Sequence, residues 1–148
     1  MRVRRSSILL LACCATILCS QAKAQTQSVK ILKIEIDGKE VKQDFKVLLY
    51  ANGSVIEPMR VENSFLVPVE VKNCKTVSVR FLFGDYNLFF DSVYLAKFET
   101  DWIVGVDKKP FDQEYVPRKE ARKFKFVYYL QFVSHQGDDT VMVVKVHK

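Results

Sequence analysis

The chain has 148 residues, a length typical of one domain, and carries a formal net charge of +6. Four of its 23 basic residues and none of its 17 acidic residues lie in the first 24 positions, so the rest of the chain is close to neutral. This balance argues against a nucleic-acid partner, because nucleic-acid-binding domains concentrate basic residues on one surface.

The first 24 residues have the pattern of a secretory signal peptide. Three arginines within the first five positions precede an apolar stretch over residues 8–19, and a small-x-small motif ends at Ala24. The apolar stretch is too short to span a bilayer. We therefore expect cleavage before Gln25, a secreted or periplasmic protein, and no transmembrane segment after cleavage. A lipoprotein anchored at Cys13 is a weaker alternative, because its motif is incomplete.

Cysteine is almost confined to the same segment. Three of the four cysteines precede residue 25, so Cys74 alone remains after cleavage and no internal disulfide is expected. One interpretation of Cys74 is a small buried apolar side chain. The other is an exposed thiol that reacts or pairs between chains, which the neighbouring Lys72 and Lys75 would favour.

The remaining domain is predicted to consist of strands, because apolar and polar residues alternate along most of it. The first strand places Leu32, Ile34 and Ile36 on its apolar face. Asp37-Gly38 follows it, and Asn52-Gly53 follows a second strand. Both dipeptides favour tight hairpin turns.

The middle of the chain predicts three further strands. Residues 55–61 form a weaker strand at an edge or a bulge, because Pro58 cannot donate a ladder hydrogen bond. Residues 65–71 and 76–83 alternate more regularly.

The next segment, residues 86–98, carries apolar side chains on both faces. It is therefore expected to be covered on both sides or broken near Asp91-Ser92. The even-numbered residues Trp102, Val104 and Val106 continue the apolar face after it.

The last part of the chain contains the longest predicted loop, residues 107–122, which has two prolines and many charges. A strong strand over residues 124–132 and a turn over 134–139 follow. The final strand, residues 141–146, is apolar on both faces, which predicts a central position in its sheet.

About seven to eight strands and no helix predict one all-β domain over residues 25–148, an antiparallel β-sandwich. In its strand pattern and in turns such as Asn52-Gly53, the chain resembles immunoglobulin-like and transthyretin-like β-sandwich modules, without matching a family motif. A small closed β-barrel is the alternative fold, because the number of strands does not distinguish the two.

No catalytic set is apparent, so we predict that the protein is not an enzyme. His135 lies in a predicted turn and His147 is the penultimate residue, and neither position suits a rigidly held general base. The alternative is a compact secreted hydrolase that uses loop carboxylates such as Asp101 and Asp112.

No cofactor or metal site is predicted either, because the sequence lacks CxxC and HExxH motifs. Four acidic residues could at most bind calcium weakly, since their spacing does not fit an EF-hand loop. These residues are Asp101, Asp107, Asp112 and Glu114.

Two aromatic residues, Trp102 and Tyr129, are predicted to lie on a surface that contacts a partner. The overall prediction is an exported binding or accessory module of the periplasm, envelope or extracellular space, with a protein or a surface polysaccharide as its partner. A structural, self-assembling envelope subunit joined through its edge strands is the remaining alternative.

Overall fold

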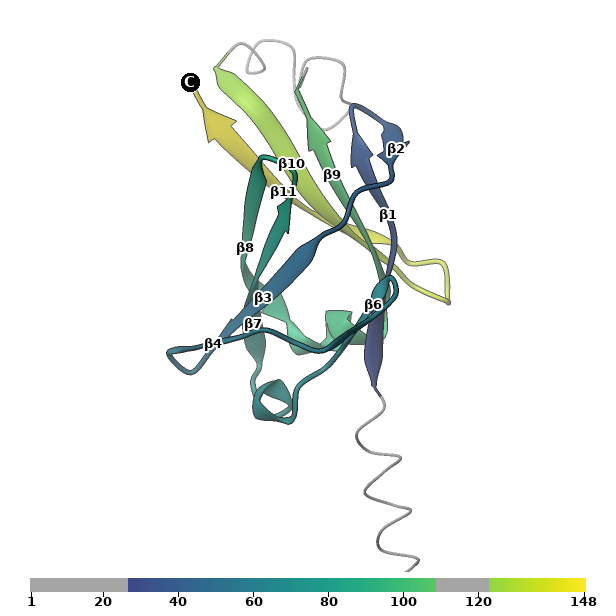
Figure 1. Ribbon diagram of the computed structural model, residues 1–148, viewed down its shortest axis with the longest axis vertical. Helices are drawn as coiled ribbons and strands as arrows, with labels where there is room; N and C mark the ends of the chain where they lie inside the picture. Colours follow the sequence, from purple (N-terminus) through teal and green to yellow (C-terminus); the bar gives the residue numbers. More distant parts are fainter. Residues whose placement is uncertain (1–26, 109–122) are drawn as a thin grey trace, which may run out of the picture.

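The structure is a computed structural model that describes residues 27–108 and 123–148 as two packed sheets (Figure 1). The larger sheet contains β1 (Ser28–Ile36), β2 (Lys39–Val41), β5 (Arg60–Val61), β6 (Ser64–Leu66), β9 (Asp101–Asp107), β10 (Phe124–Val133) and β11 (Thr140–His147). The smaller sheet contains β3 (Lys46–Ala51), β4 (Ser54–Ile56), β7 (Thr76–Phe83) and β8 (Tyr86–Tyr94). The predicted cleavage site at Ala24 and Gln25 and the carboxylates of Asp112 and Glu114 lie outside the described residues.

The seven-stranded sheet has the order β11-β10-β9-β1-β6-β5, with β2 paired to the second half of β1, and the four-stranded sheet has the order β4-β3-β7-β8. The predicted all-β sandwich is therefore confirmed, and no closed barrel is found among the described strands. The pairing is antiparallel as expected, except that β1 runs parallel to β9.

The core lies between the two sheets and is centred on Trp102. The predicted alternation of β7 is confirmed, because every second residue from Val77 to Phe83 is buried. β9 contributes Trp102, Val104 and Val106 to the same core, as predicted, but its other residues after Asp101 are buried as well. Four phenylalanine rings surround the indole with centroids 5.0–6.2 Å away in edge-to-face arrangements. Such ring pairs stabilise a core beyond the area that they bury.

Both predicted hairpin turns are present. Asp37 and Gly38 have φ angles of 52° and 79°, and Asn52 and Gly53 have 52° and 74°. Two consecutive positive φ angles define a type I′ turn, whose twist matches that of the flanking strands.

Prolines interrupt two of the predicted strands. The expected strand over 55–61 is divided at Pro58 into β4 and β5, which belong to different sheets but are both edge strands. The expected strand over 65–71 ends after β6, and a 3₁₀ turn, η1 (Val69–Val71), follows Pro68. Because the turn leaves strand geometry, Val69 is exposed instead of joining the core.

The expected break near Asp91-Ser92 is a bulge in β8. Ser92 has a φ of 54°, and the register with β7 shifts between Val77 and Val79. The bulge reverses the alternation, so Val93 is buried and Tyr94 is exposed. The expected pattern, in which the even-numbered residues share the apolar face, therefore ends at the bulge. A second 3₁₀ turn, η2 (Leu95–Glu99), then leads into β9.

The final strand corrects a prediction. β11 is not central: it is the edge strand of the seven-stranded sheet, paired only with β10 among the described strands. Its apolar residues are only half-buried or exposed. An apolar pattern on both faces predicted a central position, but among the described strands β11 has a neighbour on one edge only.

The part of the chain that the structure describes contains no helix long and apolar enough to cross a membrane.

Candidate functional site

A groove of about 460 Å³ lies along one edge of β1. On this edge β6 pairs with Ser28–Lys30, Asn63 accepts from Ile31, and β2 pairs with Ile34–Ile36, so no described strand pairs with Leu32 and Lys33 there. The groove lies at this interruption, between β6 and β2. Its lining consists of Ile31–Ile34 from β1, Glu40–Phe45 from β2 and the segment after it, Arg60 and Asn63.

The floor of the groove is shaped by a bulge in β1. Ile31 lies opposite Trp102 of β9 and Lys33 lies opposite Ile103, so Leu32 is an extra residue. A bulge turns the side chains that follow it to the other face. Leu32 is consequently 37% exposed, which corrects the prediction that it shares the buried face of Ile34. The N–H of Ile31 donates to the carbonyl of Asn63 at 2.7 Å.

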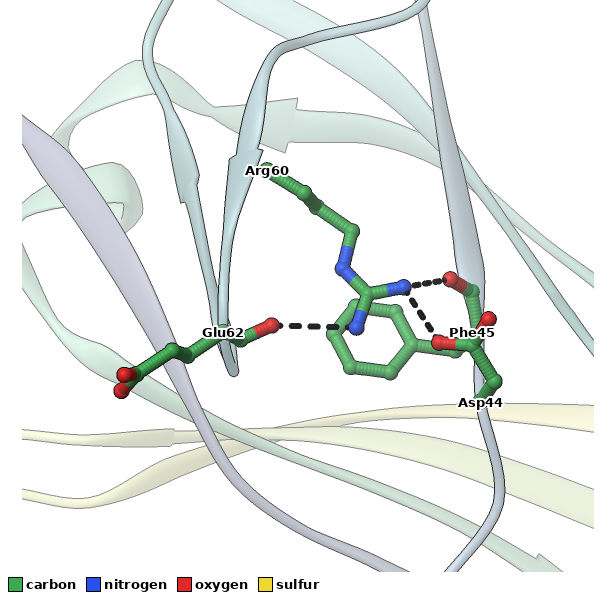
Figure 2. A network of polar contacts seen from close by, with 4 residues as sticks. All are labelled: Asp44, Phe45, Arg60 and Glu62. Atoms are coloured by element: carbon green, nitrogen blue, oxygen red, sulfur yellow. Dashed lines mark hydrogen bonds and ion pairs between the residues drawn. The ribbon is translucent and has the colours of Figure 1, made fainter.

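Arg60 of β5 lines one wall of the groove. Figure 2 shows its polar contacts with Asp44, Phe45 and Glu62. Its guanidinium carbon lies 3.9 Å from the centre of the Phe45 ring, and its Nη1 lies 2.7 Å from a carboxylate oxygen of Asp44. The same Nη1 donates to the carbonyl of Phe45, and Nη2 donates to the carbonyl of Glu62 at 3.0 Å. Arginine suits this position because its planar fork stacks on a ring and donates in several directions at once.

The Arg60 contacts join two parts of the chain that belong to different sheets. Arg60 lies in the larger sheet, whereas Asp44 and Phe45 lead into β3 of the smaller one. The hydrogen bond from Arg60, followed by its charge, lowers the pKa of Asp44 below its usual range. The Asp44 carboxylate is therefore charged at neutral pH and holds the wall in place.

A second polar cluster lies next to the groove, on the outer face of the larger sheet. Lys33 Nζ lies 2.7 Å from Glu35 Oε1, and the hydroxyl of Tyr129 donates to Glu35 Oε2. Gly105 lies opposite both Glu35 and Tyr129 in the ladders, and a methyl group on it would overlap the Tyr129 ring. Glycine is thus required there so that the Tyr129 ring can lie flat across β9.

Burial raises the pKa of Glu35, but the hydrogen bonds from Lys33 and Tyr129 outweigh burial, and the pKa lies below its ordinary value. Glu35 is therefore ionised at neutral pH. Its negative charge compensates Lys33, so this end of the groove has no excess of either charge.

The lining of the groove combines apolar and charged side chains. Its described lining contains no His, Cys, Ser or Thr side chain that could act as a nucleophile or a neutral general base. Asp44 is held ionised by Arg60, so it is a poor proton donor. What the groove offers is an apolar floor, charges of both signs and an interrupted strand edge.

The structure corrects the predicted aromatic surface. Trp102 is completely buried, and its indole N–H donates to the carbonyl of Lys97 at 2.8 Å. Tyr129 is only 9% exposed, and its hydroxyl is bonded to Glu35. Neither ring is available to a partner. The alternation of the sequence assigned each ring to the correct face of the sheet, but it could not show that both faces of this part of the sheet are covered.

The two predicted carboxylates that the structure describes are not brought together. Asp101 and Asp107 begin and end β9, so their Cα atoms are about 20 Å apart at strand spacing. Among the described residues, no group of three or more His, Cys, Asp or Glu side chains could hold a metal ion.

Cys74 is half-buried and unpaired in the structure, with its side chain packed against the core. Its sulfur accepts a hydrogen bond from Asn52 Nδ2 at 3.6 Å. This environment lies between the two interpretations drawn from the sequence, since the thiol is neither fully buried nor fully open.

No protein-family model matches this chain, and no curated protein or solved structure was found to be similar to it. The groove residues must therefore be judged from geometry alone.

The sequence reasoning missed Leu32 and Arg60 as site residues. A signal for Leu32 was present, because Ile31 and Leu32 are adjacent apolar residues where the alternation changes phase. No comparable signal marks Arg60, since its partners Asp44 and Phe45 lie more than a dozen residues away in the sequence.

Proposed function

We propose that the protein is an exported, non-catalytic binding module whose groove beside β1 receives an extended segment of a partner protein. One observation carries this proposal: the edge of β1 is open between β2 and β6, directly beside an exposed leucine. Export is supported by the signal-like pattern of the first 24 residues, and an N-terminal Gln25 in the native protein would test it.

An extended peptide fits the chemistry of the groove. A peptide that lies along a strand edge gains main-chain hydrogen bonds, and its alternate side chains give specificity. Here Leu32 offers an apolar contact, while Glu40 and Lys42 offer one charge of each sign. The Arg60 contacts fix the wall before binding, so little ordering is required when the ligand arrives.

A polysaccharide has less support as the ligand. Phe45 is the only aromatic side chain in the described lining, and the guanidinium of Arg60 covers one face of its ring. The hydrolase alternative stays a prediction, because Asp112, one of its two carboxylates, lies outside the described residues.

The test compares three proteins on peptide and glycan arrays: the wild type, Leu32→Asp and Val55→Asp. Val55 is a matched control, because it is a 59% exposed apolar residue on the smaller sheet, away from the groove. We expect the wild type and Val55→Asp to bind the same peptides. Leu32→Asp should bind them at least about tenfold more weakly, the loss expected for a buried contact of this size.

Binding to glycans alone would contradict the choice of ligand. Peptide binding that is equal in Leu32→Asp and wild type would contradict the choice of site.

A further inference from the structure

The strand edges of this protein differ sharply in how they are protected. Among the described strands, three edges are short, since β2 and β4 have three residues each and β5 has two. Short edge strands offer little backbone for another chain to pair with. The long edges are β8, with nine residues, and β11, with eight.

The edge of β8 is closed by the protein itself. The hydroxyl of Tyr128, from β10 of the other sheet, donates to the carbonyl of Phe89 at 2.8 Å and lies 3.4 Å from its N–H. The N–H and the carbonyl of Phe89 point away from β7, so the Tyr128 hydroxyl takes the place that a neighbouring strand would have on this edge. The bulge at Asp91-Ser92 distorts the rest of it, with Ser92 N–H bonded back to Ser78 Oγ at 3.2 Å. Bulges of this kind prevent pairing between chains.

Among the described residues, the edge of β11 has none of these protections. Its sequence, TVMVVKVH, contains no proline, and its ladder with β10 has no irregularity between Phe126 and Phe132. Its single lysine, Lys145, lies with its ammonium 5.5 Å from the centre of the Phe124 ring on the neighbouring strand. In an antiparallel sheet every second residue of an edge strand presents its N–H and C=O outward, so β11 offers a long, regular template.

We propose that two copies of this chain pair antiparallel through β11 and form one continuous sheet across a two-fold axis. The charges at the two ends of β11 favour a second copy of this chain as the partner. Asp138 and Asp139 precede β11, whereas His147 and Lys148 are at its other end. Antiparallel pairing places the acidic end of one copy against the basic end of the other, and does so twice.

The charge pattern also selects the register. With Val143 of each copy on the axis, Asp139 lies opposite His147 of the second copy, and Asp138 lies opposite Lys148. Lys145 lies opposite Val141, so the two lysines are offset by four residues, or about 14 Å. That separation exceeds the screening length at physiological salt, about 8 Å, so the lysines do not oppose pairing.

This contact is independent of the groove. β11 and β1 are separated by β10 and β9 in the sheet, so a β11 dimer leaves the groove of each copy open. Paired edges of this length bury less surface than a standard interface, so we expect a reversible dimer whose population rises with concentration.

Two substitutions of Val141 should change dimerisation in opposite directions. It is 49% exposed, so substitutions should leave the fold intact, and its predicted opposite residue is Lys145 of the second copy. Val141→Lys places like charges opposite each other and should weaken dimerisation about tenfold, since the contact occurs twice. Val141→Glu should strengthen it several-fold, and Val55→Lys, at the β4 edge, should leave it unchanged.

Sedimentation equilibrium of the purified protein over a range of concentrations measures these effects. In a Cys74→Ala background, Val143→Cys should also form a disulfide-linked dimer on oxidation, and Met142→Cys should not, because only residue 143 meets its own copy on the axis. A wild type that stays monomeric at millimolar concentration would overturn the proposal. So would a dimer that responds equally to Val141→Lys and Val141→Glu, or an edge that pairs only with a strand of another protein.

Discussion

β7 and β1 are both strands in which apolar and polar residues alternate, yet only β7 keeps one phase from end to end. β7 is flanked along its length by β3 and β8, and all of its odd-numbered residues are buried. β1 is flanked by β9 on one edge, but its other edge is shared between β6 and β2 with an interruption between them. The bulge at Leu32 lies at this interruption. The regular alternation of β7 thus contributes to the core, whereas the change of phase in β1 lies beside the groove.

The largest expected effect concerns the core side of this comparison. Trp102→Ala removes the ring that packs against four phenylalanines, and should lower the free energy of unfolding by about 3–5 kcal/mol. Leu32→Ala, on the floor of the groove, should cost less than about 1 kcal/mol because the side chain is already partly in solvent. Denaturant titration measures both. Similar losses in the two variants would mean that Leu32 belongs to the core after all.

A smaller effect is expected at Gly105 of β9, which lies opposite Glu35 of β1. Gly105→Ala forces the Tyr129 ring to move and breaks its hydrogen bond to Glu35, so we expect a loss of about 1–3 kcal/mol. The same substitution should cost much less in a Tyr129→Ala background, because the overlapping ring is gone. Denaturant titration of the four proteins in this double-mutant cycle gives the coupling. Additive losses would show that the ring does not restrict residue 105.

The smallest effect is the pH dependence of the Glu35 cluster. The pKa of Glu35 is lower in the folded protein than the ordinary value of 4.5, so its contribution is present above that pH. It is lost as the pH falls through the folded value. Glu35→Gln should therefore reduce stability at pH 7, by up to about 1 kcal/mol, and the difference from wild type should shrink below pH 4.

Urea titrations at pH 7 and at pH 3.5 measure this difference. Glu57→Gln, which removes an exposed ion pair with Lys46, is the control and should change stability little at either pH. A Glu35 effect that stays constant between the two pH values would rule out the charged form as its source.

Much of the sandwich could be predicted from local pattern. The two type I′ turns follow from Asp37-Gly38 and Asn52-Gly53, because few other dipeptides tolerate two positive φ angles. The core faces of β7 and β9 follow from period two. Both kinds of signal lie within a few residues of what they determine.

The site could not be predicted in the same way, because it depends on pairing over long distances in sequence. The pattern of β11 shows apolar residues on two faces, but only the sheet order reveals that no described strand pairs with its second edge. Arg60 is significant only because Asp44 and Phe45 lie beside it. Tryptophan is a residue type that binding surfaces often contain. The place of Trp102 at the centre of the core is determined by rings from four other segments.

The most direct test of the account is to map where a bound peptide lies. A peptide selected by the wild-type protein is titrated into isotopically labelled protein, and the changes in amide chemical shift are followed by NMR. The account predicts that the largest changes fall on Leu32, Lys33 and Asn63, around the interruption in the β1 edge. Changes centred on the regular strand β7, or on the closed edge of β8, with Leu32 and Lys33 unaffected, would contradict it.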